Sequence, residues 1–184
     1  MKITYNSPII LTFAIISAIA LILGVFTNDW TTKVFFSTYS SSLLNPLTYV
    51  RCFTHVLGHA NFSHYISNML FFLLLGPILE EKYGSKRILI VIGATALVTA
   101  IINNTLFSTG LLGASGVVFA FIILASMTSF REKEIPLTFI LIIVLYLGRE
   151  IFNGIFSADN ISQSGHLIGG ACGAIAGFIF SPRE

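Results

Sequence analysis

Charged residues are scarce in this sequence. Of its 184 residues, 10% are charged and 55% are hydrophobic, whereas soluble domains carry about 25% charged residues. A chain so poor in charge cannot cover a surface that faces water, which excludes an ordinary soluble domain. The formal net charge of +2 provides no basic surface for the phosphates of DNA or RNA, so no nucleic-acid partner is expected. The composition indicates an integral membrane protein surrounded by the lipid bilayer.

Cysteine is also scarce. Only Cys52 and Cys172 are present, they lie far apart, and Cys172 falls in an apolar segment, so a disulfide framework is not expected. There is no low-complexity linker and no sign of a second domain, and we therefore expect one transmembrane domain over residues 1–184. A cleavable signal peptide is not expected, because the first apolar run is long enough to span a bilayer and no clear cleavage site follows it. No cofactor is expected either.

The sequence is rich in long apolar runs. A helix that crosses a membrane needs about 20 mostly apolar residues, and we interpret six stretches as spans. They lie at about 8–26, 62–79, 88–107, 113–130, 136–156 and 165–180. The connection between the first two is too long for a simple turn, and it carries aromatic residues of the kind found at membrane interfaces. The expected fold is an all-α membrane protein, a bundle of six transmembrane helices with a long first outer loop.

The basic residues predict how this bundle is oriented, because cytoplasmic loops carry an excess of Lys and Arg. With a cytoplasmic N-terminus, seven of the ten basic residues fall on the cytoplasmic side: Lys2, Lys82, Lys86, Arg87, Arg131, Lys133 and Arg183. The three on the outer side are Lys33, Arg51 and Arg149. The distribution predicts a multi-pass protein of the plasma or inner membrane with both termini in the cytoplasm.

This orientation brings polar residues from three spans to one depth. The second, fourth and sixth spans all run from the outer side inward, so each begins near the outer face. His64 and Asn68 lie near the start of the second span, Ser115 near the start of the fourth and His166 near the start of the sixth. Polar residues within spans usually face the interior of the bundle. We therefore expect these four side chains to approach one another.

Ser115 permits two interpretations. Flanked by Gly113 and Gly116, it fits either close helix packing or the role of a nucleophile. His166 lies beside a ridge in which glycine recurs every fourth residue, at positions 165, 169, 173 and 177. Helix packing explains the glycines but does not require the histidine. If the fourth span packs on this ridge, His166 can accept the proton that Ser115 must lose to act as a nucleophile.

His64 and Asn68 also permit two interpretations. They are four residues apart and share one face of a helix, so by themselves they fit a polar pair that holds helices together. Beside a reactive serine, their side chains and the Ser115 amide become candidate donors to an oxyanion. A carboxylate such as Asp159 could complete a triad with His166, but acidic residues in loops are usually solvated, and a dyad is the simpler hypothesis.

Two further histidines, His55 and His59, precede His64 at a spacing that could suggest a metal site. The only nearby acidic residues, Glu80 and Glu81, lie at the opposite end of the second span, and a catalytic zinc commonly takes three protein ligands with ordered partners. Hydrogen bonding within the outer loop is the preferred interpretation of these two histidines. No metal is expected.

Four segments, in this order, resemble the rhomboid intramembrane serine proteases in their six-span bacterial form: RCFTHVLGHANFSHYISN, GPILEEKYGS, GASGVVFAF and GHLIGGACG. The resemblance extends over about residues 51–177. It implies that Ser115 is the nucleophile and His166 the general base. It also implies that His64 and Asn68 form the oxyanion site together with the Ser115 amide.

The same resemblance implies supporting roles for other residues. Those around the reactive pair are Gly113, Gly116, Phe119, Gly169 and Gly173, and those with structural roles are Arg51, His55, His59 and Glu80. Three positions depart from the family. Val50 stands where a tryptophan often precedes the arginine, Phe119 stands where a tyrosine often stacks on the histidine, and Ser67, just before Asn68, is small where family members can carry a bulky residue. Phenylalanine keeps the ring and loses only the hydroxyl.

The function that the resemblance implies is a serine endopeptidase that cleaves transmembrane segments of membrane proteins near the outer face. The main alternative is a catalytically silent rhomboid-like protein that binds membrane clients, which the presence of both Ser115 and His166 disfavours. A transporter is disfavoured because the polar cluster lies toward one face and no inverted repeat is visible. A zinc metalloprotease is disfavoured because it would need a metal site at His55, His59 and His64, where none is expected.

Overall fold

The computed structural model describes residues 4–128, 137, 140–141, 144–145 and 160–180. Within these ranges the chain is helical, and its one β-type pairing is an isolated bridge between Thr38 and Leu111. The helices are α1 Pro8–Phe26, α2 Trp30–Phe35, α3 Pro46–Thr54, the 3₁₀ helix η1 His55–Leu57, α4 Phe62–Tyr83, α5 Ser85–Leu106, α6 Ser115–Ser126 and α8 Asn160–Ile179. The all-helical class expected from the sequence is confirmed for this part of the chain.

Three of the described helices, α1, α4 and α5, are long and apolar enough to cross a membrane, and α6 is a shorter apolar helix. Large apolar side chains on these helices point outward, for example Phe26 on α1, Leu70 on α4 and Ile101 on α5. Such a surface is stable against lipid and not against water. These helices therefore define a membrane protein.

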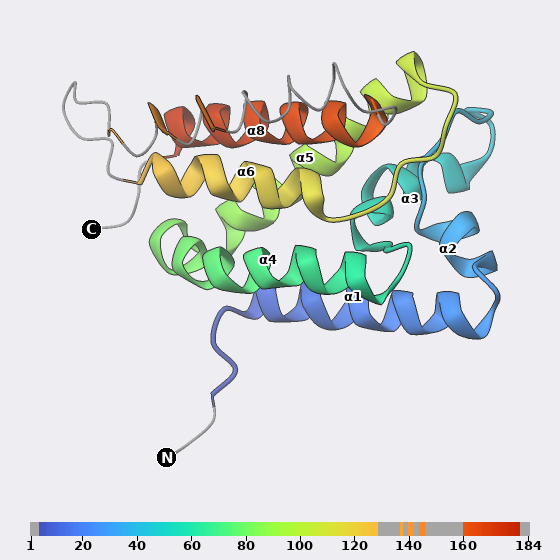
Figure 1. Ribbon diagram of the computed structural model, residues 1–184, viewed down its shortest axis with the longest axis horizontal. Coiled ribbons are helices and arrows are strands. Elements are labelled where there is room, and N and C mark those ends of the chain that lie inside the picture. The colour runs from blue at the N-terminus through green and yellow to red at the C-terminus, as the bar shows by residue number, and fades with distance from the viewer. Residues whose placement is uncertain (1–3, 129–136, 138–139, 142–143, 146–159, 181–184) are drawn as a thin grey trace.

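The bundle is built from helix pairs that lie side by side (Figure 1). Helix α1 packs along α4, α6 packs along most of α8, and α5 contacts α4, α6 and α8. The short helices α2 and α3 lie at one end of the bundle, which is also the end where α4 and α6 begin (Figure 1). This end brings the polar starts of two long helices next to the connection between α1 and α4.

The helices differ from the expected spans at several ends. Helix α8 begins at Asn160 and not at residue 165, because polar residues continue this helix. Helix α4 continues beyond residue 79 to Tyr83, and α5 already begins at Ser85, because Gly84 between them has a φ of +83° and breaks the helix. Helix α6 begins at Ser115 and not at residue 113, because Gly113 has a φ of +120°. The fifth expected span, 136–156, lies largely outside the described residues.

Glu80 near the end of α4 holds the start of α1. Its Oε1 accepts hydrogen bonds from the Ile9 amide at 3.2 Å and the Ser85 hydroxyl at 2.6 Å, and its Oε2 accepts one from the Ile10 amide at 3.1 Å. The first amides of a helix have no partner within the helix, and the Ser7 side chain does not cap α1. A carboxylate that is only 4% exposed therefore caps α1 from a neighbouring helix.

We expect Glu80→Gln to lower the free energy of unfolding by about 1–3 kcal/mol. The glutamine side chain lacks the negative charge of the carboxylate and has one accepting oxygen in place of two. The measurement is the thermal midpoint of the detergent-solubilised protein. Glu81→Gln is the matched control, since the neighbouring side chain is exposed. Equal midpoints for the two variants would contradict the proposed role of Glu80.

Candidate active site

Glycines allow α6 and α8 to touch backbone to backbone. The Cα of Gly169 faces the carbonyl of Gly116, and the Cα of Gly173 faces the carbonyl of Ala120. A Cβ built on Gly116 would in turn lie 3.2 Å from the Gly165 carbonyl oxygen. We call this contact the glycine seam. It corresponds to the small-residue ridge expected from the sequence, and it brings the start of α6 close to Gly165 and Gly169 of α8.

Ser115 and His166 lie on the two sides of the glycine seam. Ser115 is the first residue of α6 and is half-buried. Phe119 follows it by four residues and so lies on the same face of α6. The His166 ring packs against Phe119 with 4.3 Å between ring centroids and 41° between ring planes. The hydrogen bonds of the described residues do not include one from the Ser115 hydroxyl.

His64 and Asn68 reach the segment just before Ser115. A Cβ built on Gly113 would lie 2.8 Å from His64 Cε1, 2.9 Å from His64 Nε2 and 3.9 Å from Asn68 Nδ2. Only glycine fits here, both because of this closeness and because of the φ of +120° at Gly113. The absence of a side chain at Gly113 lets two polar groups of α4 approach the start of α6.

Hydrogen bonds determine which protons these two side chains offer. The Ala60 amide donates to His64 Nδ1 at 3.4 Å, so in the neutral ring Nε2 carries the proton. One N–H of the Asn68 amide donates to the His64 carbonyl at 3.1 Å, which leaves its second N–H. The amide of Ser115 lies in the first turn of α6 and has no partner within that helix. Three N–H groups are thus available near Gly113.

The segment before Ser115 is anchored to the connection between α1 and α4. The Gly113 amide donates to the His55 carbonyl at 2.9 Å. Leu111 and Thr38 exchange two backbone hydrogen bonds, of 2.9 and 2.8 Å. The backbone that leads into Ser115 is therefore held by hydrogen bonds to the connection between α1 and α4.

His55 and His59 make hydrogen bonds within this connection. His55 Nδ1 donates to the Arg51 carbonyl at 3.1 Å, and its Nε2 lies 3.3 Å from the Thr99 hydroxyl of α5. His59 Nδ1 donates to the Leu57 carbonyl at 3.2 Å, and its ring meets the His64 ring edge-on with 5.1 Å between centroids. The described residues contain no group of three or more His, Cys, Asp or Glu side chains that could hold a metal.

Both histidines are held in the neutral form. Burial lowers the pKa of His55 from 6.5 to about 4, against the raising effect of its backbone hydrogen bonds. Burial, followed by the nearby His64, lowers the pKa of His59 to about 4 as well. Both rings are almost fully buried, and an imidazolium there would lose its hydration.

These shifts predict that the protein loses stability in mild acid. Between pH 6.5 and 4 the unfolded chain binds protons at His55 that the folded chain does not, so the free energy of unfolding falls as pH falls. At pH 5 the protonation of His55 in the unfolded chain lowers the free energy of unfolding by about 2 kcal/mol. We expect a lower thermal midpoint at pH 5 than at pH 7.5, and a smaller difference in His55→Gln, whose amide does not titrate. The same difference in both proteins would contradict the role of His55.

The structure brings together most of the residues selected from the sequence. His64, Asn68 and Gly113 converge before Ser115, while Phe119 and His166 pack together one helical turn further along. Asp159 lies outside the described residues. The sequence did not indicate Thr99, which contacts His55, although a buried threonine in the middle of an apolar helix is a weak signal for such a contact.

Comparison with known proteins agrees with this arrangement. Residues 46–183 match the rhomboid domain. The rhomboid protease GlpG of Haemophilus influenzae is 23% identical over 134 residues, which cover 71% of this chain and 69% of that protein. The rhomboid protease GluP of Bacillus subtilis is 30% identical over 154 residues, which cover 79% of this chain and 29% of that protein. The rhomboid protease GlpG of an Enterobacter species is 30% identical over 84 residues, which cover 46% of this chain and 30% of that protein.

The match to the rhomboid domain extends over most of the chain, which therefore belongs to the rhomboid family. Its similarity to these proteases classes it as a rhomboid-type serine protease of the membrane. The chain spans less than a third of two of these relatives.

Proposed function

We propose that this protein is an intramembrane serine endopeptidase in which Ser115 is the nucleophile and His166 is its general base. The observation that carries the proposal is the contact of the His166 ring with Phe119, at 4.3 Å between centroids, one turn along α6 from Ser115. It supports a histidine positioned over the face of α6 that carries the serine. The pair works as a dyad, without a carboxylate.

In the first step the Ser115 oxygen forms a bond to the substrate carbonyl carbon while its proton passes to His166. The tetrahedral intermediate then collapses, the carbon–nitrogen bond breaks, and His166 returns the proton to the leaving amine. The product is an acyl-enzyme. A water molecule, deprotonated by His166, hydrolyses the ester and regenerates the serine.

The negative oxygen of the intermediate requires hydrogen-bond donors. His64 Nε2–H, the second N–H of Asn68 and the Ser115 amide supply them in this proposal. The closeness of His64 Nε2 and Asn68 Nδ2 to Gly113 supports it, because these groups of α4 lie near the backbone that precedes Ser115. The tautomer of His64, set by the Ala60 amide, directs its proton toward this region.

The substrates in this proposal are transmembrane segments of other membrane proteins. A helical peptide hides its carbonyls in hydrogen bonds, so the cleaved segment must unwind locally, which favours small or helix-breaking residues at the cleavage site. The distribution of basic residues supports an orientation with both termini in the cytoplasm. The active site then lies toward the outer face of the plasma or inner membrane, where water can reach it.

A serine-directed fluorophosphonate probe tests the assignment. We expect the detergent-solubilised protein to be labelled, the label to map to Ser115 by peptide mass spectrometry, and His166→Ala to be labelled far more slowly. A well-folded protein that remains unlabelled would instead support the silent rhomboid-like alternative. Loss of proteolysis on chelation, with unchanged proteolysis in Ser115→Ala, would support a metalloprotease.

A further inference from the structure

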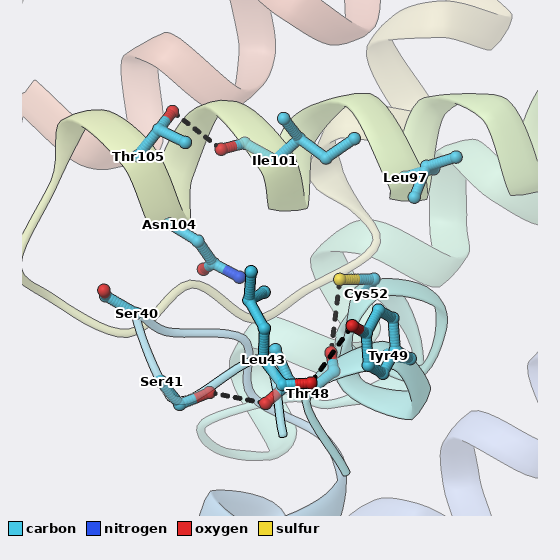
Figure 2. Close-up of a pocket in the computed structure, with 10 residues that line it drawn as sticks. All are labelled: Ser40, Ser41, Leu43, Thr48, Tyr49, Cys52, Leu97, Ile101, Asn104 and Thr105. Carbon is cyan, nitrogen blue, oxygen red and sulfur yellow. Dashed lines mark hydrogen bonds between the residues drawn. The ribbon is translucent and has the colours of Figure 1, made fainter. Parts of the chain in front are cut away.

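A pocket of about 440 Å³ lies between α5 and the connection that contains α3 (Figure 2). We call it the loop pocket. It is lined by Ser40, Ser41, Leu43, Thr48, Tyr49, Cys52, Leu97, Ile101, Asn104 and Thr105. None of these residues belongs to the proposed catalytic machinery. The pocket therefore needs an explanation of its own.

The lining of the loop pocket changes from apolar to polar along α5. Leu97 and Ile101 lie within the helix, while Asn104 and Thr105 lie near its end at Leu106. At a rise of 1.5 Å per residue, the distance from Leu97 to Thr105 is about 12 Å. Ser40 and Ser41 line the pocket from the connecting segment. This gradient fits an amphiphile with its polar group at the end of α5 and its apolar part along Leu97 and Ile101.

The surface around the loop pocket is suited to lipid. Leu43 is 71% exposed and Leu44 is 95% exposed, and Tyr49 and Phe53 of α3 are also exposed. Exposed apolar side chains beside the polar end of a transmembrane helix are typical of contact with the membrane interface. Lipid molecules are thus the neighbours from which an occupant would come.

A buried positive charge lies directly behind the polar wall. Arg51 is 3% exposed, and its guanidinium donates to Ser41 Oγ at 3.0 Å and to Thr48 Oγ1 at 3.5 Å, both of which line the pocket. It also donates to the Tyr39 hydroxyl at 2.6 Å. The described residues give Arg51 no carboxylate partner, and its Nε–H has no acceptor among them. Buried charges are usually paired, so this wall favours an anion.

Two residues that line the polar part of the pocket, Ser40 and Asn104, have donors that the described hydrogen bonds do not use. No described hydrogen bond uses the hydroxyl of Ser40, which is exposed. Asn104 donates one N–H to the Thr38 hydroxyl at 2.9 Å, and its other N–H remains. The hydroxyls of Tyr49 and Thr105 donate to backbone carbonyls and contribute less.

We propose that the loop pocket binds an anionic glycerophospholipid. Its phosphate lies between Ser40 and Asn104, in the field of Arg51, and one acyl chain follows Leu97 and Ile101. The chemistry is non-covalent: a phosphodiester accepts two hydrogen bonds and receives a positive field, while the acyl chain covers apolar surface.

Native mass spectrometry of the full chain in detergent tests this, with phosphatidylglycerol, phosphatidylcholine and diacylglycerol of identical acyl chains as probes. We expect phosphatidylglycerol to be retained about tenfold more tightly than either of the others, a difference equivalent to one decade in Kd. Equal retention of all three, or of phosphatidylglycerol and phosphatidylcholine, would overturn the proposal.

Two pairs of variants locate the bound lipid. Ile101→Trp fills the pocket, whereas Ile90→Trp adds the same ring at another exposed position of α5 outside it. Ser40→Asp places a like charge at the rim, whereas Ser108→Asp places it at an exposed position that does not line the pocket. We expect the first member of each pair to lose about tenfold in retention and the second to lose none, with thermal midpoints reported for all four. Unchanged retention in both Ile101→Trp and Ser40→Asp would overturn the proposal.

Discussion

Ser115→Ala is expected to lower the rate of cleavage of a single-span model substrate by roughly a thousandfold or more, the scale seen when a serine protease loses its nucleophile. The methyl group of alanine cannot form the acyl-enzyme, so only the effects of binding and of the oxyanion donors remain. Gel analysis of the two fragments with reconstituted enzyme measures the rate.

Ser115→Ala should leave the fold intact. The serine is half-buried and its hydroxyl is not among the described hydrogen bonds, so the thermal midpoint should match that of the wild-type protein. Ser67→Ala on α4 provides a control, since that hydroxyl bonds only to backbone carbonyls of its own helix. Cleavage by Ser115→Ala at the wild-type rate would contradict the assignment of Ser115 as the nucleophile.

Gly169→Ala is expected to damage both stability and activity. The added methyl group would overlap the carbonyl of Gly116 across the glycine seam, and backbone atoms on both sides leave no flexible side chain that could move aside. Overpacking of this kind typically costs about 1–3 kcal/mol. If α8 shifts by about 1 Å to relieve it, His166 moves relative to Ser115, and cleavage can fall by about a hundredfold.

Gly93→Ala is the matched control. Gly93 lies in the middle of α5, and a Cβ built there meets no atom within 4 Å. Because alanine is favoured over glycine inside a helix by about 1 kcal/mol, this variant should be at least as stable as the wild-type protein and cleave at the same rate. If Gly169→Ala matched Gly93→Ala in midpoint and rate, the contact between α6 and α8 would not determine the site geometry.

Much of the candidate site could be predicted from the sequence, because local patterns decide where its residues lie. The apolar runs and the basic residues predict that His64, Ser115 and His166 lie near the starts of spans that run in one direction. The glycine period predicted the ridge on α8 along which α6 packs. The resemblance to the rhomboid family implied that the Phe119 ring stacks on His166, and the structure shows this contact.

Other features depend on contacts between segments that are distant in the sequence, and no local pattern encodes them. The carboxylate of Glu80 was expected to be structural, but its hydrogen bonds to Ile9 and Ile10 join residues about seventy positions apart. Gly113 combines a positive φ with a close approach of the His64 ring from α4, and this approach joins residues about fifty positions apart. The polar residues Ser85, Lys86 and Arg87 form the first turn of α5, but the apolar pattern of the sequence does not begin until Ile88.

The glycine seam also separates what can be redesigned from what cannot. Gly169 and Gly173 admit no larger side chain and Gly116 leaves little room for one, so a protein engineer has little freedom at these positions to alter substrate preference. The freedom lies on α4, where Ser67 is exposed one position before Asn68. A library aimed at new substrates should therefore vary the α4 surface and hold the seam constant.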